Sequence, residues 1–337
     1  MVVRVIMFAT VIFLNSSVES QSASAPTKVV GSYSAMNARV APLWIAQDQG
    51  YFKKYGTDID AVFIRTGPLQ VASLVSGDTD IGYMGATNVV GAAGGGSDLR
   101  ILASFTNRVN YDLVVRPGIK SPEDLRGKRF GVQAIGGTVW MGAVLGLEHL
   151  GLEPGRDNIS MLNVGDQSVL AQALLAGTID ATVLDGVCSR RLNERGFPIL
   201  AEFSKINIPF SSTGIVVRQA YLERQPSATL ENFLKAILEA NAFLQRPASK
   251  ASVLRILMRR LRLSEREAEE GYRDTLAGLD LKPYPSLEGM LNIQRLMKLR
   301  NPKLEKVKVV ELIDDRILRK LDESGFIERL YSSYGVK

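Results

Sequence analysis

Short apolar runs alternate with longer segments of helical periodicity over the first two thirds of the chain. Two such series follow one another, the first starting near residue 28 and the second near residue 129. Strands that alternate with helices are typical of βαβ units and a mainly parallel sheet. The pattern therefore predicts an α/β protein built from two lobes.

The predicted strands are short runs rich in Val, Ile and Leu. They comprise Val29–Ser32, Ile59–Ile64, Ile81–Met84, Ile101–Phe105, Leu113–Val115, Arg129–Val132, Ser160–Val164, Ala181–Leu184 and Thr213–Arg218. The predicted helices are Pro42–Tyr55, Pro68–Ser76, Thr138–Leu150, Ser168–Ala176 and Val187–Glu194. From Pro226 onward the chain is predominantly helical, so these last helices need a sheet face on which to bury their apolar sides.

One motif occurs in both series, as SLVSGDTDIG at residues 73–82 and as ALLAGTIDAT at residues 173–182. Each copy has an apolar helix end, a glycine stop, a short turn with aspartate and then a strand. Glycine supplies the left-handed position after a helix, and aspartate satisfies backbone donors in the turn. Any helix-to-strand turn has this layout, yet the shared offset of 100 residues favours two related lobes. The matched pairs are Leu74/Leu174, Gly77/Gly177 and Asp80/Asp180.

We predict that the chain enters lobe 1, crosses to lobe 2 and returns. Lobe 1 is expected to comprise residues 26–112 and 214–337, and lobe 2 residues 113–213. The extended segments Asn110–Arg116 and Pro209–Val217 are the candidate crossovers.

The N-terminus resembles a targeting segment. Met1–Arg4 carries a positive charge, and the apolar run Val5–Leu14 is too short to span a bilayer as a permanent helix. We therefore predict a signal peptide over residues 1–25, the alternative being a buried N-terminal helix. No cysteine follows it that could carry a lipid. The predicted location is the periplasm.

Composition is that of a globular protein, with 46% hydrophobic residues among 337 and a mean hydropathy of +0.05. The net charge is +6, but the basic residues cluster mainly in Arg255–Arg266 and acidic residues follow at once. We interpret this segment as a solvated helix face and expect no nucleic-acid partner. The single cysteine, Cys188, cannot form an internal disulfide, so burial must supply the stability. We expect a monomer without cofactors.

The segment APLWIAQDQGYFKKYG at residues 41–56 resembles the opening helix of the nitrate/sulfonate/taurine-type solute-binding proteins, a family that includes thiamine-precursor binders. The similarity continues through SPEDLRGKRFGV at residues 121–132, LLAGTIDATVLD at residues 174–185 and GIVVRQAYLERQP at residues 214–226. This resemblance implies a type II periplasmic-binding fold. It also implies that a small ligand is held between the lobes and handed to an ABC permease in the inner membrane.

In open α/β sheets, ligands bind outside the carboxyl ends of the strands, where loops lead into helices. Such loops place free N–H groups and a positive dipole end at the cleft, although Ser, Thr and Asn also cap helices without any ligand. The lobe 1 candidates for ligand contact are Ser34, Asn37, Thr66, Gly67, Gln70, Ala86 and Thr87.

In lobe 2, GVQAIGGT at residues 131–138 has the glycine spacing of a phosphate loop, but Gly137 stands where the lysine should be. This departure argues against an NTPase. Gly136, Gly137 and Thr138 then form either a backbone-amide cradle for the ligand or a tight turn with no ligand. Trp140 offers a stacking surface or belongs to the core. Asp185 accepts hydrogen bonds from a ligand amine or caps the next helix.

Some enzymes of the resembling superfamily make a thiamine pyrimidine and need a reactive histidine together with a cysteine-rich motif. This chain has one histidine, His149, on a predicted helix away from the candidate loops, and one cysteine without a histidine nearby in sequence. No metal-binding spacing is present. We therefore predict a binding protein and no catalytic residues. The alternatives are a periplasmic sensor or adaptor and a biosynthetic enzyme of the same superfamily.

Overall fold

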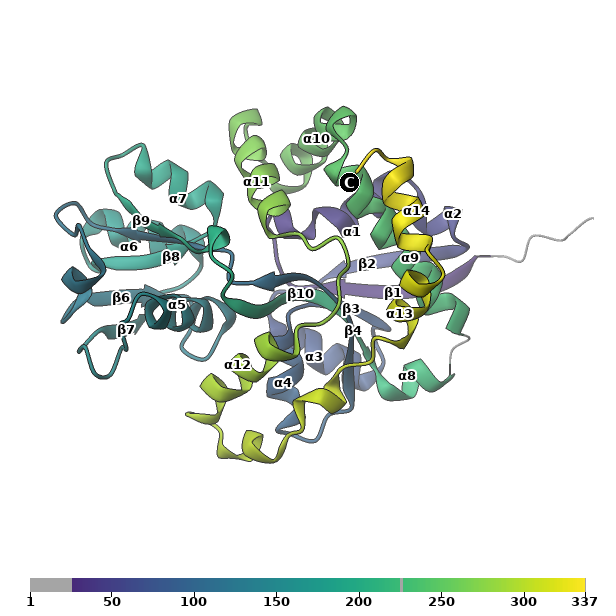
Figure 1. The fold of residues 1–337 in the computed structure, drawn as a ribbon, viewed down its shortest axis with the longest axis horizontal. Coiled ribbons are helices and arrows are strands. Elements are labelled where there is room, and N and C mark those ends of the chain that lie inside the picture. The colour runs from purple at the N-terminus through teal and green to yellow at the C-terminus, as the bar shows by residue number, and fades with distance from the viewer. Residues whose placement is uncertain (1–25, 225–226, 337) are drawn as a thin grey trace, which may run out of the picture.

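Two five-stranded mixed sheets organise the structure (Figure 1). The computed structural model describes residues 26–224 and 227–336. The first sheet has the order β2-β1-β3-β10-β4 and the second the order β7-β6-β8-β5-β9. The strands are β1 Thr27–Tyr33, β2 Thr57–Phe63, β3 Ile81–Met84, β4 Leu99–Arg108, β5 Asp112–Val115, β6 Arg129–Val132, β7 Ser160–Asn163, β8 Ala181–Leu184, β9 Ile199–Glu202 and β10 Pro209–Arg218.

Helices cover both sheets. Those of the two alternating series are α1 Ala41–Asp48, α2 Tyr51–Lys54, α3 Gly67–Ser76, α4 Ala86–Ala93, α5 Thr138–His149, α6 Gln167–Ala176 and α7 Gly186–Asn193. The C-terminal third adds α8 Gln219–Arg224, α9 Ser227–Gln245, α10 Lys250–Leu261, α11 Glu265–Gly278, α12 Leu287–Lys298, α13 Arg316–Glu323 and α14 Phe326–Ser333. Among the described residues, no helix is both long and apolar enough to cross a bilayer.

The two sheets have the same topology, which confirms the predicted two-lobed α/β fold. β1 and β6 each pair in parallel with two neighbours, while β10 and β5 run antiparallel to the strands beside them. The repeated turns are equivalent as well, since Gly77 and Gly177 end α3 and α6 with φ of 92° and 72°. In each lobe the following aspartate, Asp80 or Asp180, accepts a hydrogen bond from the backbone of the neighbouring strand.

Most predicted elements are confirmed, and β3, β6 and β8 coincide with their predictions residue for residue. The predicted helix Pro42–Tyr55 is instead two helices, because Gly50 adopts φ of 72° between them. Two elements were missed. They are α4 and β9, and β9 is a four-residue strand, ILAE, whose residues are all only partly buried.

The chain crosses between the sheets twice, between β4 and β5 and again before β10. Asp112 belongs to the second sheet, and residues 209–213 belong to the first. These positions lie a few residues from the predicted lobe boundaries. The second crossover therefore precedes the extended segment 209–217, which is part of one ten-residue strand.

Hydrophobic burial holds each layer in place. Trp44 on α1 is fully buried in a cluster with residues of α9, α10 and α14. A second cluster continues from the other face of the first sheet into the second lobe. The predicted signal peptide lies outside the described residues.

Candidate functional site

A cleft with two adjoining compartments separates the lobes. The first has a volume of about 550 Å³ and the second about 490 Å³. Both compartments draw lining residues from both lobes, and they share a set of polar and small residues at their junction. The shared residues are Ser34, Ala35, Asn37, Arg39, Gln133, Gln167 and Asp185.

The cleft lies where strands end and helices begin, as expected for an open α/β sheet. Thr66 precedes α3, Gly85 precedes α4 and Gly137 precedes α5, and all three of these capping residues have extended backbones. Gly85 cannot be replaced without movement, since an added Cβ would lie 2.4 Å from the carbonyl oxygen of Ser212. Three helix N-termini therefore converge on the first compartment, which offers backbone donors and positive dipole ends to a ligand.

Seven of the predicted ligand contacts line the cleft: Ser34, Asn37, Thr66, Gly67, Gly137, Thr138 and Asp185. Several of them also cap helices. The Thr66 hydroxyl accepts from the backbone N–H of Leu69 at 3.4 Å, and Asp185 Oδ1 accepts from that of Cys188 at 3.1 Å. The same residue can thus cap a helix and line the cleft, and ligand contact by these residues remains a prediction.

Gln70 and Ala86 are corrections to the predicted set, because neither reaches the cleft. The Gln70 side chain is fully buried, and its Nε2 donates to the carbonyl oxygen of Ser32 at 2.8 Å. Ala86, the first residue of α4, is likewise fully buried. Gln70 and Ala86 belong to helices whose N-termini border the cleft, but neither residue is part of the cleft lining.

Trp140 is a further correction. Trp140 is 8% exposed and belongs to the buried hydrophobic cluster that continues from the first sheet into the second lobe, so it is core rather than a stacking surface at the cleft. Gly136 lies outside the cleft lining and adopts φ of 88°, and it faces Arg300. The amide cradle is also smaller than predicted, because the Gly137 N–H donates to the carbonyl oxygen of Ala134 at 3.0 Å. The glycine pair therefore closes a tight turn.

Thr87 has a different role from the one predicted. It is outside the cleft lining, and its hydroxyl lies 3.0 Å from that of Thr138. Thr87 belongs to α4 of the first lobe and Thr138 to α5 of the second, so this hydrogen bond joins the lobes directly.

Arg39 is the functional candidate that sequence reasoning missed. Its side chain is 10% exposed, lines both compartments and has no hydrogen-bond partner for Nε within the described residues. The guanidinium donates to the carbonyl oxygen of Asn110 and lies 4.7 Å from the centre of the Tyr111 ring. The sequence did contain a signal that could have identified this residue, because Arg39 is the only charged residue between Lys28 and Asp48.

Arg39 remains charged despite its burial. Burial opposes the charge, but contact with Tyr111 and the carboxylates of Asp274 and Asp185 raises the pKa of the guanidinium. A buried cation beside a cavity is a strong attractor for an anionic ligand group, because the low local dielectric strengthens the interaction.

The helix α11 brings an acidic residue to the same place. Asp274 lines the second compartment, and its Oδ2 lies 4.0 Å from the Arg39 guanidinium. It also packs against Gly186 at the start of α7, so it touches the other lobe. Burial, with Asp185 and Asp112 nearby, raises the pKa of Asp274 to about 7 even though Arg39 lowers it.

This raised pKa predicts a pH effect on stability. The folded state holds the proton of Asp274 more tightly than the unfolded state, so this residue costs stability as the pH rises from about 4 to about 7. In Asp274→Asn, the loss of unfolding free energy between pH 5 and pH 8 should be smaller than in the wild type by about 1–2 kcal/mol. Urea unfolding at both pH values measures it, and equal losses in the two proteins would contradict the assignment.

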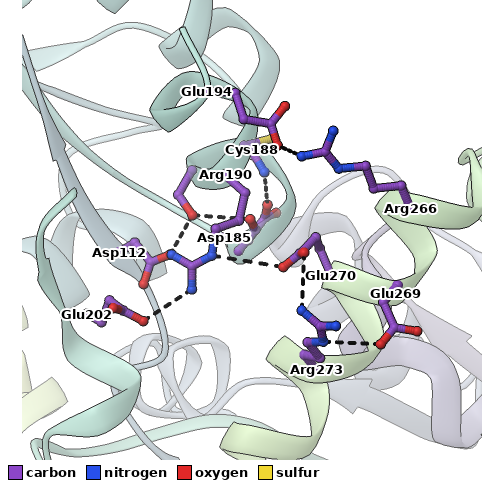
Figure 2. A network of polar contacts seen from close by, with 12 residues as sticks. Asp112, Asp185, Cys188, Arg190, Glu194, Glu202, Arg266, Glu269, Glu270 and Arg273 are labelled. Atoms are coloured by element: carbon purple, nitrogen blue, oxygen red, sulfur yellow. Dashed lines mark hydrogen bonds and ion pairs between the residues drawn. The ribbon is translucent and has the colours of Figure 1, made fainter. Parts of the chain in front are cut away.

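A network of ion pairs links α11 to α7 next to the cleft (Figure 2). Arg190 lies 3.3 Å from Asp112, 3.1 Å from Glu202 and 3.9 Å from Glu270 of α11. On the rim, Arg266 contacts Glu194 and Arg191 contacts Glu267. Helix α11 thus contacts the second lobe through several charged side chains in addition to Asp274.

The candidate nucleophiles have unsuitable surroundings. Cys188 lines the second compartment, but burial and the adjacent Asp185 raise the pKa of its thiol to about 12. His149, the last residue of α5, is exposed and outside the cleft lining. Within the described residues, no cluster of His, Cys, Asp and Glu could hold a metal ion. Burial of the Cys188 thiol therefore disfavours its thiolate, and His149 lies away from the cleft, so neither residue is placed to act as a nucleophile there.

Comparisons with known proteins agree with this architecture. The sequence model of the family described as NMT1/THI5 like matches residues 37–249. The taurine-binding periplasmic protein of Escherichia coli strain K12 is 28% identical over 216 residues, which cover 61% of this chain and 66% of that protein. The 4-amino-5-hydroxymethyl-2-methylpyrimidine phosphate synthase THI13 of Saccharomyces cerevisiae is 27% identical over 146 residues, 42% of this chain and 41% of the synthase. Both matches span less than two thirds of the relative's length.

A solved structure gives the fold independently. The periplasmic aliphatic sulphonate binding protein SsuA from Escherichia coli superposes with a TM-score of 0.68 at 19% identity, over 86% of this chain and 96% of that chain. At this identity the likeness establishes the two-lobed periplasmic-binding fold alone. The family match covers more than half of the chain and agrees with the motifs found in the sequence. The chain therefore belongs to the NMT1/THI5-like family.

Proposed function

We propose that this protein is the exported solute-binding subunit of an ABC importer, and that it captures a small organic anion between its lobes for delivery to a membrane permease. The buried guanidinium of Arg39, which lines both compartments of the interlobe cleft, carries the proposal. The N-termini of α3, α4 and α5 add positive dipole ends around the first compartment. An anionic group fits this set of donors better than a neutral one.

The proposed contacts around that group come from both lobes. Ser34, Asn37, Thr66 and Gly67 lie on the first lobe, and Thr138 and Asp185 on the second. A ligand that contacts both sets stabilises the closed arrangement, in which Thr87 and Thr138 also meet. The crossovers before β5 and before β10 would act as the hinge. Release would then require only that the lobes separate.

The relatives support a binding role and leave a second candidate. The taurine-binding protein is periplasmic by its name, whereas the yeast relative is a synthase. A synthase reaction needs reactive groups, and the high pKa of Cys188 and the exposed position of His149 disfavour one here. A periplasmic sensor would use the same cleft and would differ only in docking to a receptor instead of a permease.

A thermal-shift panel on the protein without residues 1–25 tests the proposal. We expect at least one small sulfonate, carboxylate or nitrate to raise the melting temperature by several degrees when present far above its dissociation constant. Pyrimidines and uncharged alcohols of similar size serve as controls and should shift it less. Incubation with each stabilising compound, followed by mass spectrometry, should recover the compound unchanged. A panel in which no anion stabilises the protein, or in which a compound is converted, would overturn the proposal.

A further inference from the structure

Helix α11 is anchored on the first lobe. Ala268 and Tyr272 are buried in the hydrophobic cluster around α1 and α9. At Gly271 the helix lies so close to the turn Ala38–Val40 that an added Cβ would meet the side chain of Ala38 at 3.0 Å. When the lobes separate, α11 must therefore stay with the first lobe.

Another face of α11 is joined to α7 of the second lobe by two ion pairs. Arg191 of α7 contacts Glu267 of α11, and Arg266 of α11 contacts Glu194 at the end of α7. Each helix thus supplies one arginine and one glutamate. Among the residues that the structure describes, none of these four side chains has a second ion-pair partner. Separation of the lobes would break both pairs.

Arg190 of α7 has a different position from Arg191. It lies 3.9 Å from Glu270 of α11, but only 3.3 Å from Asp112 and 3.1 Å from Glu202, which belong to the second sheet (Figure 2). Arg190 would therefore keep two carboxylate partners after the lobes separate, and its contact with Glu270 adds little to closure.

A third ion pair joins the lobes through two other helices. Arg295 of α12 donates to both carboxylate oxygens of Glu148 on α5, at 3.0 and 2.6 Å. Helix α12 lies on strand β10 of the first sheet, where an added Cβ at Gly289 would come within 2.6 Å of Phe210. Helix α5 belongs to the second lobe, so this bidentate pair also breaks when the lobes separate.

We propose that these three ion pairs, Arg191–Glu267, Arg266–Glu194 and Arg295–Glu148, form an interlobe latch that favours the closed cleft without any ligand. Their arginine side chains are 50% to 73% exposed, so each charge remains solvated when its pair breaks. One exposed pair changes an equilibrium by about fivefold at most. Three pairs that break in the same motion can change it by up to about 100-fold.

Exposure also makes the latch sensitive to salt. The screening length falls from about 30 Å at 0.01 M salt to about 3 Å at 1 M. The ionic strength around the protein therefore sets the ratio of closed to open molecules. The latch itself requires no ligand, and only its consequence for ligand affinity rests on the proposed function.

Förster transfer in the protein without residues 1–25 and without any ligand tests the latch. Ala72 on α3 and Gln172 on α6 are exposed positions at equivalent places in the two lobes, and cysteines there accept the two dyes in a Cys188→Ser background. The closed population should dominate at about 10 mM salt. At about 500 mM salt the ratio of closed to open molecules should fall about tenfold or more.

A triple variant removes the three carboxylates of the latch as Glu148→Gln, Glu194→Gln and Glu267→Gln. Glutamine at position 267 can still accept from the backbone N–H of Ser264, so the start of α11 is retained. At about 10 mM salt this variant should have a closed-to-open ratio at least about tenfold below that of the wild type, and salt should change it less than about threefold.

Two further variants separate the latch from a general effect of charge. Arg319→Gln removes an exposed pair with Asp315 that lies wholly within the first lobe, and it should leave the transfer unchanged. The exchange of Arg191→Glu with Glu267→Arg should retain most of the closed population. A wild type that is equally open at both salt concentrations, or a triple variant as closed as the wild type, would overturn the latch. Neither result concerns anion binding at Arg39, which the thermal-shift panel tests separately.

Discussion

Replacement of Arg39 with glutamine is expected to lower the affinity for an anionic ligand by about 100-fold to 1000-fold. The guanidinium is buried at the junction of the two compartments. Among the described residues, Arg39 is the one cationic side chain that borders both compartments. Loss of a charged hydrogen-bonding partner in such a place leaves the ligand anion desolvated without compensation. Calorimetric titration with whichever anion stabilises the wild type measures the effect.

This experiment must distinguish a loss of binding from a loss of stability, because the Arg39 guanidinium also donates a hydrogen bond to the carbonyl oxygen of Asn110 and lies 4.0 Å from Asp274. The double variant Arg39→Gln with Asp274→Asn removes the unpaired carboxylate and should recover stability without recovering affinity for the anion. Arg255→Gln is the matched control, since Arg255 is an exposed arginine of α10 that bonds only to a nearby serine. An Arg39→Gln protein that folds and binds the anion as tightly as the wild type would exclude Arg39 from the site.

Replacement of Gly289 with alanine is expected to reduce the free energy of unfolding by about 3 kcal/mol. Gly289 lies in the first turn of α12, where alanine would normally favour the helix by about 1 kcal/mol. Here an added Cβ would lie 2.6 Å from the backbone carbonyl carbon of Phe210 and 2.8 Å from its Cα and N. A strand backbone cannot move aside as a side chain can, so α12 would have to separate from β10.

Urea unfolding of the variant measures this loss, and Gly155→Ala supplies the control. An added Cβ at Gly155 would meet no heavy atom within 4 Å, so that substitution should change the unfolding free energy by less than about 0.5 kcal/mol. Because α12 packs against the strand that follows the second crossover, Gly289→Ala should also weaken ligand-dependent closure. Equal stability of the two variants would show that α12 is not seated on β10 as described.

The fold was predicted from local patterns of apolar residues and glycines along the chain. Alternation of apolar runs with helical periodicity located the strands, most clearly β3, β5 and β8, because these central strands are buried throughout and appear in the sequence as short apolar runs. The Gly77 and Gly177 turns were recognised because the left-handed backbone there requires glycine, and their 100-residue spacing revealed two related lobes. β9 escaped detection although Ile199, Leu200 and Ala201 form an apolar run, because so short a run does not by itself distinguish an edge strand from a loop.

The direction of individual side chains was harder to predict than the loops that carry them. Gln70 and Trp140 follow loops that do line the cleft, yet both side chains turn into the protein interior. Their orientation depends on which neighbour fills the space beneath the helix, and sequence spacing does not report it. Arg39 was overlooked for the opposite reason, since its functional surroundings come from Asn110, Tyr111 and Asp274, all distant in sequence.

The sequence by itself determined the two-lobed α/β fold, the repeated turns and the family motifs, because periodicity, glycine stops and strand composition are local properties of the chain. Only the tertiary structure decided the charge of the cleft. The contact between Arg39 and Asp274 joins residues more than 230 positions apart, one in the 3-10 turn Ala38–Val40 and the other in α11. Such proximity arises from the packing of the C-terminal helices against both lobes, which no local pattern specifies.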